Sequence, residues 1–216
     1  MKNGAIFDMD GLLFDTERLY QENWIIVAKE FGQQPHPDFP IAICGSSGIH
    51  AQEVVHKYYP SVDAPAFIQS CVDKVNAILQ TFVPEKPGVH EILSYLHEND
   101  VRMAVASSSI KPMVEHNLEL AGIAQYFDVV VSGQEVVYGK PEPDIFLLAA
   151  ERLGLSPMDC YVFEDGINGA KAGLAAGCTT IMIPDLTPPT EELKHACAGI
   201  YSSLLEAKDA MLQHEI

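Results

Sequence analysis

Short apolar runs alternate with longer amphipathic segments along most of this chain, and this alternation constrains the fold more than any other feature. Each run is rich in Val, Ile, Phe or Ala and ends in small or acidic residues, as the buried strands of parallel sheets do. The sequence therefore predicts a parallel α/β sheet. Its strands are expected at Gly4–Phe7, Arg102–Ala106, Val129–Val131, Tyr161–Phe163 and Thr180–Ile183.

The segments between these runs have helical periodicity and helical punctuation. Proline lies near the start of two of them, and Gly122, Gly154 and Gly177 lie just past the ends of three, where helices commonly begin and stop. Strands that alternate with helices in this way are typical of a doubly wound, Rossmann-like α/β fold. The helices are expected at Gly88–Glu98, Pro112–Ala121, Pro143–Leu153 and Asn168–Ala176.

One stretch interrupts the alternation. Residues 15–83 have helical periodicity but no convincing buried strand, so we expect an all-helical cap domain inserted into an α/β core domain formed by residues 1–14 and 84–216. The flanks Phe14–Thr16 and Val83–Pro87 would be the two hinge strands of a mobile cap. The cap helices are expected at Glu17–Phe31, His50–Tyr58 and Ala64–Thr81, joined by Gln33–Pro40 and Gly45–Gly48.

Composition excludes several classes of protein. With 216 residues and 48% hydrophobic content the chain can bury a sizeable core. A net charge of −17 argues against binding to nucleic acid or to an anionic membrane, so an anionic substrate would need a local cationic site. Five cysteines without a CxxC pair indicate neither a disulfide framework nor a zinc site. We expect a soluble, unprocessed cytoplasmic protein without a membrane span, either a monomer or a small homo-oligomer.

The first chemistry-bearing motif, Asp8-Met9-Asp10-Gly11, follows directly on the first expected strand. Strand side chains two residues apart point to the same side, so Asp8 and Asp10 can face one site. Paired carboxylates repel unless a cation bridges them or one is protonated. One of the two could then attack as a nucleophile while the other carries a proton. The alternative is a surface Asp-Gly turn.

Three further polar motifs follow other expected strands. At Ser107 and Ser108, hydroxyl and backbone N–H groups could hold phosphate oxygens, although serine is also a common helix cap. Lys140 lies in a proline-containing loop and offers a point charge for phosphate, although most such lysines are solvated. Glu164 and Asp165 offer hard oxygen ligands that suit Mg²⁺, or a helix-capping Asp.

All four motifs are expected at the carboxyl ends of parallel strands. Open α/β sheets bind their ligands at this edge. Four unrelated surface features would not gather there, so the sequence predicts one site.

The motifs resemble, in kind and order, those of the haloacid dehalogenase-like hydrolases, and the match spans nearly the whole chain. The position of the helical insertion is similar to that of the cap in the β-phosphoglucomutase-like and phosphatase subgroup. The matching residues are Asp8-x-Asp10-Gly11-x-x-x-Asp15-Thr16, Ser107, Lys140-Pro141 and Glu164-Asp165.

This resemblance implies a reaction and a role for each residue. Asp8 would attack phosphorus to form an aspartyl phosphate, and Asp10 would protonate the leaving oxygen and then activate water. Ser107, with Ser108 beside it, and Lys140 would hold the phosphoryl oxygens. The resemblance also implies a Mg²⁺ cofactor bound by the Asp8 carboxylate, the Asp10 backbone carbonyl and Asp165, with Glu164 as a ligand or as an acid beside the ligands.

The cap favours a phosphatase over a phosphomutase. β-Phosphoglucomutase resembles this chain at Trp24, but it has His where this chain has Tyr20 and a cap-loop Arg where this chain reads Gly45-Ser46-Ser47-Gly48-Ile49. A mutase must hold a second phosphate, and a cation is the natural means. We expect Tyr20, Trp24, Gly45, Ser46 and Ser47 to contact the substrate, a small phosphorylated metabolite such as a sugar or polyol monophosphate.

Three alternatives belong to other classes of function. A phosphomutase of the β-phosphoglucomutase type is the nearest. A dehalogenase would use Asp8 but has no use for an acid at Asp10 or a magnesium carboxylate at Asp165. A non-enzymatic phospho-acceptor domain combines similar residues, but a signalling domain gains nothing from a positioned hydrolytic base.

Overall fold

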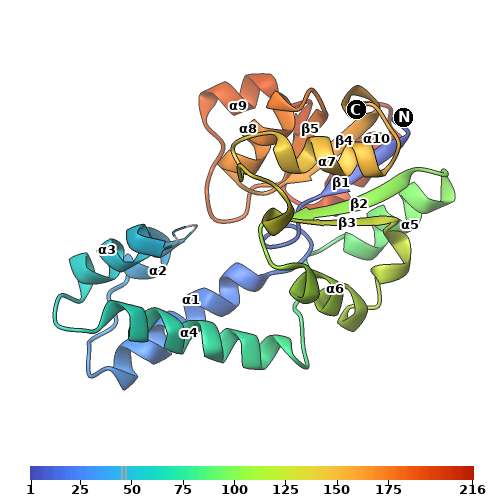
Figure 1. Ribbon diagram of the computed structural model, residues 1–216. Coiled ribbons are helices and arrows are strands. Elements are labelled where there is room, and N and C mark those ends of the chain that lie inside the picture. Colours follow the sequence, from blue (N-terminus) through green and yellow to red (C-terminus); the bar gives the residue numbers. More distant parts are fainter. Residues whose placement is uncertain (45, 47) are drawn as a thin grey trace. The chain divides into compact units, whose positions relative to one another are not determined.

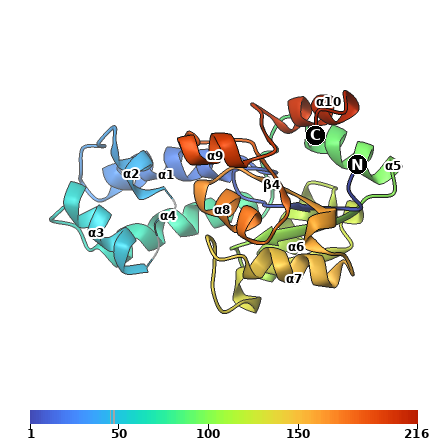
Figure 2. The ribbon, with the colours of Figure 1, turned by 90° about the horizontal axis from the view of Figure 1, so that it is seen from above.

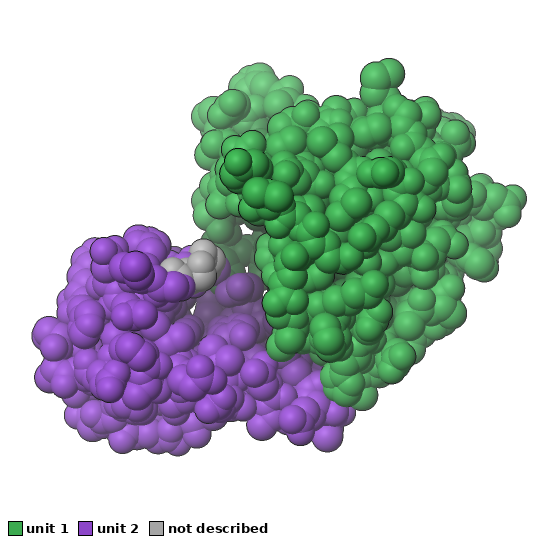
Figure 3. Space-filling view, in the orientation of Figure 1, with its two compact units in different colours: residues 1–14, 84–216 green, residues 15–83 purple. Residues whose placement is uncertain are grey.

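The computed structural model describes residues 1–44, 46 and 48–216. It contains two compact units, shown in Figures 1 and 3. Unit 1 comprises residues 1–14 and 84–216, and unit 2 comprises residues 15–83.

Unit 1 is built on one parallel sheet, which confirms the predicted fold class. The strand order is β3-β2-β1-β4-β5-β6. Phe7 of β1 pairs with Val105 of β2 on one side and Phe163 of β4 on the other. The strands are β1 (Gly4–Phe7), β2 (Arg102–Ser107), β3 (Val129–Ser132), β4 (Cys160–Glu164), β5 (Thr179–Met182) and β6 (Gly199–Ile200).

Helices cover both faces of this sheet. The chain moves outward from β1 through α5 and α6, then returns past β1 and continues through α7, α8 and α9. Since parallel crossovers are right-handed in nearly all proteins, this reversal places the two sets of helices on opposite faces. Figure 1 shows α7 and α8 above the strands and α6 below, and Figure 2 shows α10 beside α5. The helices are α5 (Val89–Glu98), α6 (Lys111–Leu120), α7 (Asp144–Arg152), α8 (Ile167–Ala175), α9 (Glu191–Ala196) and α10 (Leu204–Leu212).

The core of unit 1 lies on the two faces of the central strands. All four residues of β1 and all five of β4 are buried, as expected for strands covered on both faces. Phe7 stacks on Phe163 with ring centroids 4.7 Å apart, while Ile6 and Val162 pack with Phe146 of α7. This packing fixes the ends of β1 and β4, from which the polar residues of the next section project.

Unit 2 contains only helices in its described residues. Its core is aromatic: Trp24 stacks on Phe67 at 5.8 Å and meets Phe39 edge to face at 5.5 Å. Such pairs contribute about 0.5–1.5 kcal/mol beyond their area burial. The helices are α1 (Thr16–Glu30), α2 (Phe39–Ile43), α3 (Gly48–Tyr58) and α4 (Ala64–Leu79).

Some predicted element bounds were wrong. Thr16, expected in a hinge strand, begins α1. In place of the two expected hinge strands, the flanks form an isolated bridge between Phe14 and Glu85. The expected linker Gln33–Pro40 ends in α2, because proline is compatible with the first turn of a helix. None of the helices in the described residues is both long and apolar enough to span a membrane.

Candidate active site

The polar residues predicted to share one site project from adjacent strands. Asp8 directly follows β1, Ser107 ends β2 and Glu164 ends β4. β1 lies where the strand order reverses, and the crevice at this reversal is where open α/β sheets bind ligands. The Asp8 N–H donates to the Phe163 carbonyl at 3.0 Å, so the strand pairing continues into the nucleophile candidate.

Lys140 joins the ends of all three strands. Its Nζ donates to Asp8 Oδ1 at 2.5 Å, to Glu164 Oε1 at 2.6 Å and to the Ala106 carbonyl at 3.1 Å. The side chains of Lys140 and Glu164 are only 9% and 3% exposed. The ammonium group also lies 5.0 Å from the centroid of the Phe146 ring, which favours a cation. The predicted phosphate-binding cation is therefore a buried charge held against the predicted nucleophile.

Glu164 has both carboxylate oxygens engaged. Oε1 accepts from Lys140, and Oε2 accepts from the Gly166 N–H at 3.0 Å. A Cβ at Gly169 would overlap the Glu164 carboxylate, so glycine is required there for close approach. Glu164 therefore orients Lys140.

Two serine hydroxyls face Asp10. Ser109 Oγ donates to Asp10 Oδ2 at 2.8 Å, and Ser107 Oγ donates to the same oxygen at 3.4 Å. Ser108 lies between them and is exposed. The site thus brings together Asp8, Asp10, Ser107 and Lys140.

Asp165 completes a group of three carboxylates. Asp8, Glu164 and Asp165 each offer an oxygen, and these oxygens lie within 4.8 Å of one another. Gly11, at φ +87°, leaves room for Asp165, since a Cβ there would overlap its carboxylate. Three acids beside one lysine form an anionic donor set of hard oxygens, which suits a divalent cation.

Burial and mutual repulsion raise the pKa of two of these acids. Burial raises the pKa of Asp8 to about 7, against the lowering effect of Lys140 and with further increases from Glu164 and Asp10. Burial raises the pKa of Asp165 to about 9, with Glu164 and Asp8 adding to it. Burial lowers the pKa of Lys140, but Asp8 and Glu164 outweigh that effect and raise it. Burial and the neighbouring carboxylates thus disfavour the charged forms of Asp8 and Asp165.

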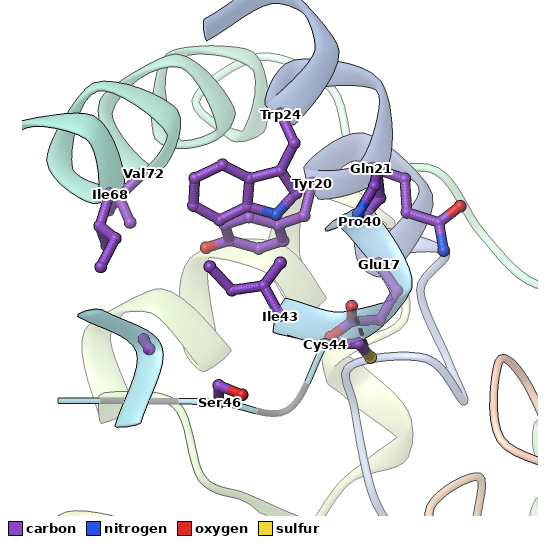
Figure 4. Close-up of a pocket in the computed structure, with 11 residues that line it drawn as sticks. Glu17, Tyr20, Gln21, Trp24, Pro40, Ile43, Cys44, Ser46, Ile68 and Val72 are labelled. Atoms are coloured by element: carbon purple, nitrogen blue, oxygen red, sulfur yellow. Dashed lines mark hydrogen bonds between the residues drawn. The ribbon is translucent and has the colours of Figure 1, made fainter. Parts of the chain in front are cut away.

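Unit 2 has a pocket of about 240 Å³ that contains several of the predicted substrate-contacting residues (Figure 4). Tyr20 and Trp24 both line it, and their rings overlap in the view, with Ile43 drawn below them. Ser46 also lines the pocket, whereas Gly45 and Ser47 lie outside the described residues. The remaining lining residues are Glu17, Gln21, Pro40, Cys44, Ala51, Ile68 and Val72.

The sequence did not predict three residues of the strand-end site and of the unit 2 pocket. Ser109 could have been found by the two-residue alternation that pairs Asp8 with Asp10. Glu17 lines the pocket, where its Oε2 accepts from Cys44 Sγ at 3.4 Å. Asp185, after β5, accepts from Lys86 Nζ at 2.7 Å and contributes to the raised pKa of Asp165, after burial, Glu164 and Asp8. A lone Asp past a strand carries no sequence signal for such a contact.

Comparison with known proteins decides the family. The family model described as haloacid dehalogenase-like hydrolase matches residues 5–183. The chain belongs to the haloacid dehalogenase-like hydrolases. The matched region includes all four predicted motifs, so the resemblance inferred from them is confirmed.

Named relatives and a solved structure agree with this membership. A Drosophila melanogaster protein named as a probable pseudouridine-5′-phosphatase is 34% identical over 214 residues, covering 94% of this chain and 90% of the relative. Fructose-1-phosphate phosphatase YqaB of Escherichia coli is 35% identical over 179 residues, covering 82% and 94%. The crystal structure of a HAD family hydrolase from Deinococcus radiodurans, with bound phosphate and sodium, superimposes with a TM-score of 0.85 at 26% identity, covering 99% and 96%.

Proposed function

We propose that this haloacid dehalogenase-like hydrolase is a Mg²⁺-dependent phosphatase that acts on a small phosphorylated metabolite through an aspartyl phosphate at Asp8. The observation that carries the proposal is the placement of Lys140 on Asp8, with Asp10 held by serine hydroxyls at the same sheet edge. A nucleophile, a cation for the phosphoryl oxygens and a candidate acid are the parts that phosphoryl transfer requires.

The residues divide the reaction between them. An Asp8 oxygen forms a bond to phosphorus as the bond to the leaving oxygen breaks, and Asp10 gives that oxygen a proton. In the second half, water attacks phosphorus, the Asp8–phosphorus bond breaks, and Asp10 takes the proton of the water. Ser107, the backbone N–H of Ser108 and Lys140 hold the phosphoryl oxygens.

The three carboxylates of the site, those of Asp8, Glu164 and Asp165, form a set of ligands that fits Mg²⁺. Asp8, Asp165 and the Asp10 backbone carbonyl would hold the ion, with Glu164 beside them orienting Lys140. Bound there, Mg²⁺ supplies positive charge for the phosphoryl oxygens. The raised pKa values of Asp8 and Asp165 support this assignment, because burial and repulsion between the carboxylates disfavour their charged forms, and a bound cation would offset both.

Magnesium should stabilise the fold more at alkaline pH than at acidic pH. Because the pKa of Asp165 is raised from 3.8 to about 9, the metal-free folded protein binds a proton there that the unfolded chain has lost. Its free energy of unfolding therefore falls as pH rises between these values. Mg²⁺ replaces the proton, so the increase in Tm with Mg²⁺ should be larger at about pH 8 than at about pH 5.

Thermal unfolding scans with and without Mg²⁺ at the two pH values check this expectation. Asp165→Asn serves as the control, since it should lose most of the Mg²⁺-dependent increase. An equal increase at both pH values, or a full increase in Asp165→Asn, would contradict the metal assignment.

The pocket of unit 2 supports a substrate with one phosphate and a neutral body. Among its described lining residues there is no Lys or Arg, and Glu17 places a carboxylate there. If this pocket receives the body of the substrate, a second phosphate in it would meet this carboxylate, with no Lys or Arg among the described lining residues. Aromatic faces and acceptor oxygens instead suit a sugar, polyol or nucleoside body whose hydroxyls donate hydrogen bonds.

A panel of phosphorylated metabolites assayed with Mg²⁺ tests the proposed function. We expect phosphate release from sugar, polyol or nucleoside monophosphates, and little from bisphosphates. The same panel scores the conversion of β-glucose 1-phosphate to glucose 6-phosphate. Efficient conversion without phosphate release would replace the phosphatase by the mutase, and no reaction with any phosphate ester would refute both.

Glu17→Gln should change the selectivity of the enzyme without changing its chemistry. Loss of the negative charge should raise kcat/KM for bisphosphates relative to monophosphates by roughly 10-fold, the scale of a single unpaired charge in a partly solvated site. Kinetics on a matched monophosphate and bisphosphate pair measure the ratio. Lys74→Gln, which breaks the Lys74–Glu30 ion pair between α1 and α4, is the control and should leave the ratio unchanged.

A further inference from the structure

Ser109, the last of the three consecutive serines at the end of β2, makes the shorter of the two serine contacts with Asp10. Ser109 Oγ lies 2.8 Å from Asp10 Oδ2, against 3.4 Å for Ser107 Oγ. Ser107 and Ser109 are two residues apart, and both face the site while Ser108 is exposed. None of the motifs that identify the family includes Ser109.

The two serines cannot serve Asp10 equally during the reaction. A hydroxyl has one proton to donate. Ser107 Oγ already accepts from the Ser109 N–H at 3.0 Å. In the proposed reaction the Ser107 hydroxyl donates its one hydrogen bond to a phosphoryl oxygen. Its long contact with Asp10 is then given up. Of these two serines, Ser109 is the one that keeps its hydrogen bond to Asp10.

Ser109 is itself held from the neighbouring strand. Its carbonyl oxygen accepts from Ser132 Oγ at 2.7 Å, and Ser132, at the end of β3, is buried. The Ser132 N–H donates to Glu135 Oε1 at 2.9 Å, and Glu135 pairs with Arg152 of α7 at 2.7 Å. A continuous polar chain therefore runs from α7 through the end of β3 to Asp10.

We infer that Ser109 is a positioning residue that holds the Asp10 carboxylate for proton transfer. The inference rests on the proposed phosphatase reaction. When water attacks the aspartyl phosphate, the bond from the water oxygen to phosphorus forms, the bond from phosphorus to Asp8 breaks and Asp10 takes the proton. Proton transfer needs the base within hydrogen-bond distance of that water. Ser109 fixes the rotamer of Asp10 that satisfies this need.

Pre-steady-state kinetics of Ser109→Ala with p-nitrophenyl phosphate test the inference. This leaving group departs without protonation, so Asp10 is required only for the second half of the reaction. The burst of nitrophenolate should keep its rate within about threefold, while steady-state turnover should fall roughly 10- to 100-fold, the scale of a displaced general base. The fraction of phosphorylated enzyme during turnover should rise. With a sugar monophosphate, whose oxygen needs a proton to leave, the first half should slow as well.

Matched variants separate positioning from a structural effect. Ser109→Thr keeps the hydroxyl and should recover turnover, whereas Ser109→Val has a similar shape without the hydroxyl and should behave as Ser109→Ala does. Ser94→Ala removes another partly buried hydroxyl of unit 1, which contacts the Tyr126 hydroxyl at 3.0 Å, and should change neither half of the reaction.

Two failures can be told apart. If the wild-type protein forms no phosphorylated Asp8 with any substrate, the proposed function itself is wrong. If the wild-type protein does form phosphorylated Asp8, the variants Ser109→Ala and Ser109→Val decide the positioning role. That role alone is wrong if the two variants slow both halves of the reaction with p-nitrophenyl phosphate equally, or if they slow neither half.

Discussion

Replacement of Asp8 by Asn is expected to lower turnover by a factor on the order of 10⁴ or more while the fold is retained, because the substitution removes the attacking oxygen. The asparagine oxygen can still accept from Lys140, and a neutral group suits a buried position where burial raises the pKa of the acid. Steady-state phosphate release measures the loss, and thermal unfolding measures the fold.

Asp8→Ala is the companion variant, since an asparagine that deamidates would restore the wild-type residue. Both variants should unfold cooperatively and both should be inactive. If either retains more than about a hundredth of wild-type turnover, a loss far smaller than removal of a nucleophile causes, Asp8 does not carry the covalent step.

Lys140→Met should give the largest loss of stability of any change in the site. The substitution keeps the aliphatic stem and removes the ammonium group that pairs with both Asp8 and Glu164. Breaking one side of a buried ion pair costs about 3–5 kcal/mol. The loss should be smaller at about pH 5 than at about pH 8, because protonation of the remaining acids relieves their repulsion. Chemical denaturation at the two pH values measures it.

Addition of Glu164→Gln to the Lys140→Met variant separates the effect of Lys140 on stability from its effect on catalysis. The double variant Lys140→Met/Glu164→Gln should recover part of the lost free energy of unfolding, since one carboxylate is neutralised. It should not recover activity, because the cation for the phosphoryl oxygens is still absent. A single variant destabilised by less than about 1 kcal/mol, as a solvent-exposed pair would be, contradicts the buried network.

The sheet could be predicted because each central strand is a continuous apolar run with a polar end. β1 lies at Gly4–Phe7 as expected, and β4 extends the expected strand by one residue at each end. The edge strand β6 (Gly199–Ile200) was not predicted, because two residues of a strand carry no periodicity. The helix α10 was missed although its buried residues Leu204, Ala207 and Met211 lie on one helical face.

The site was predictable as far as strand ends reveal it. Asp8 directly follows β1, and Glu164 is the last residue of β4. The two side chains meet because the carboxyl ends of parallel strands lie at one edge of the sheet. Lys140 comes from a loop, and its contact with both acids depends on tertiary packing that no local pattern encodes. Trp24 shows the other limit: a buried aromatic residue of a helix can pack in the core, line a pocket, or, as here, do both.

The most direct test of the central claim is mass spectrometric mapping of the enzyme quenched in acid during turnover of p-nitrophenyl phosphate with Mg²⁺. Ser109→Ala should raise the trapped fraction and so improve detection. We predict one phosphoryl group on the peptide that contains Asp8, and none in Asp8→Asn. A phosphoryl group on any other residue, or phosphate release from an enzyme that never carries one, would contradict the covalent mechanism.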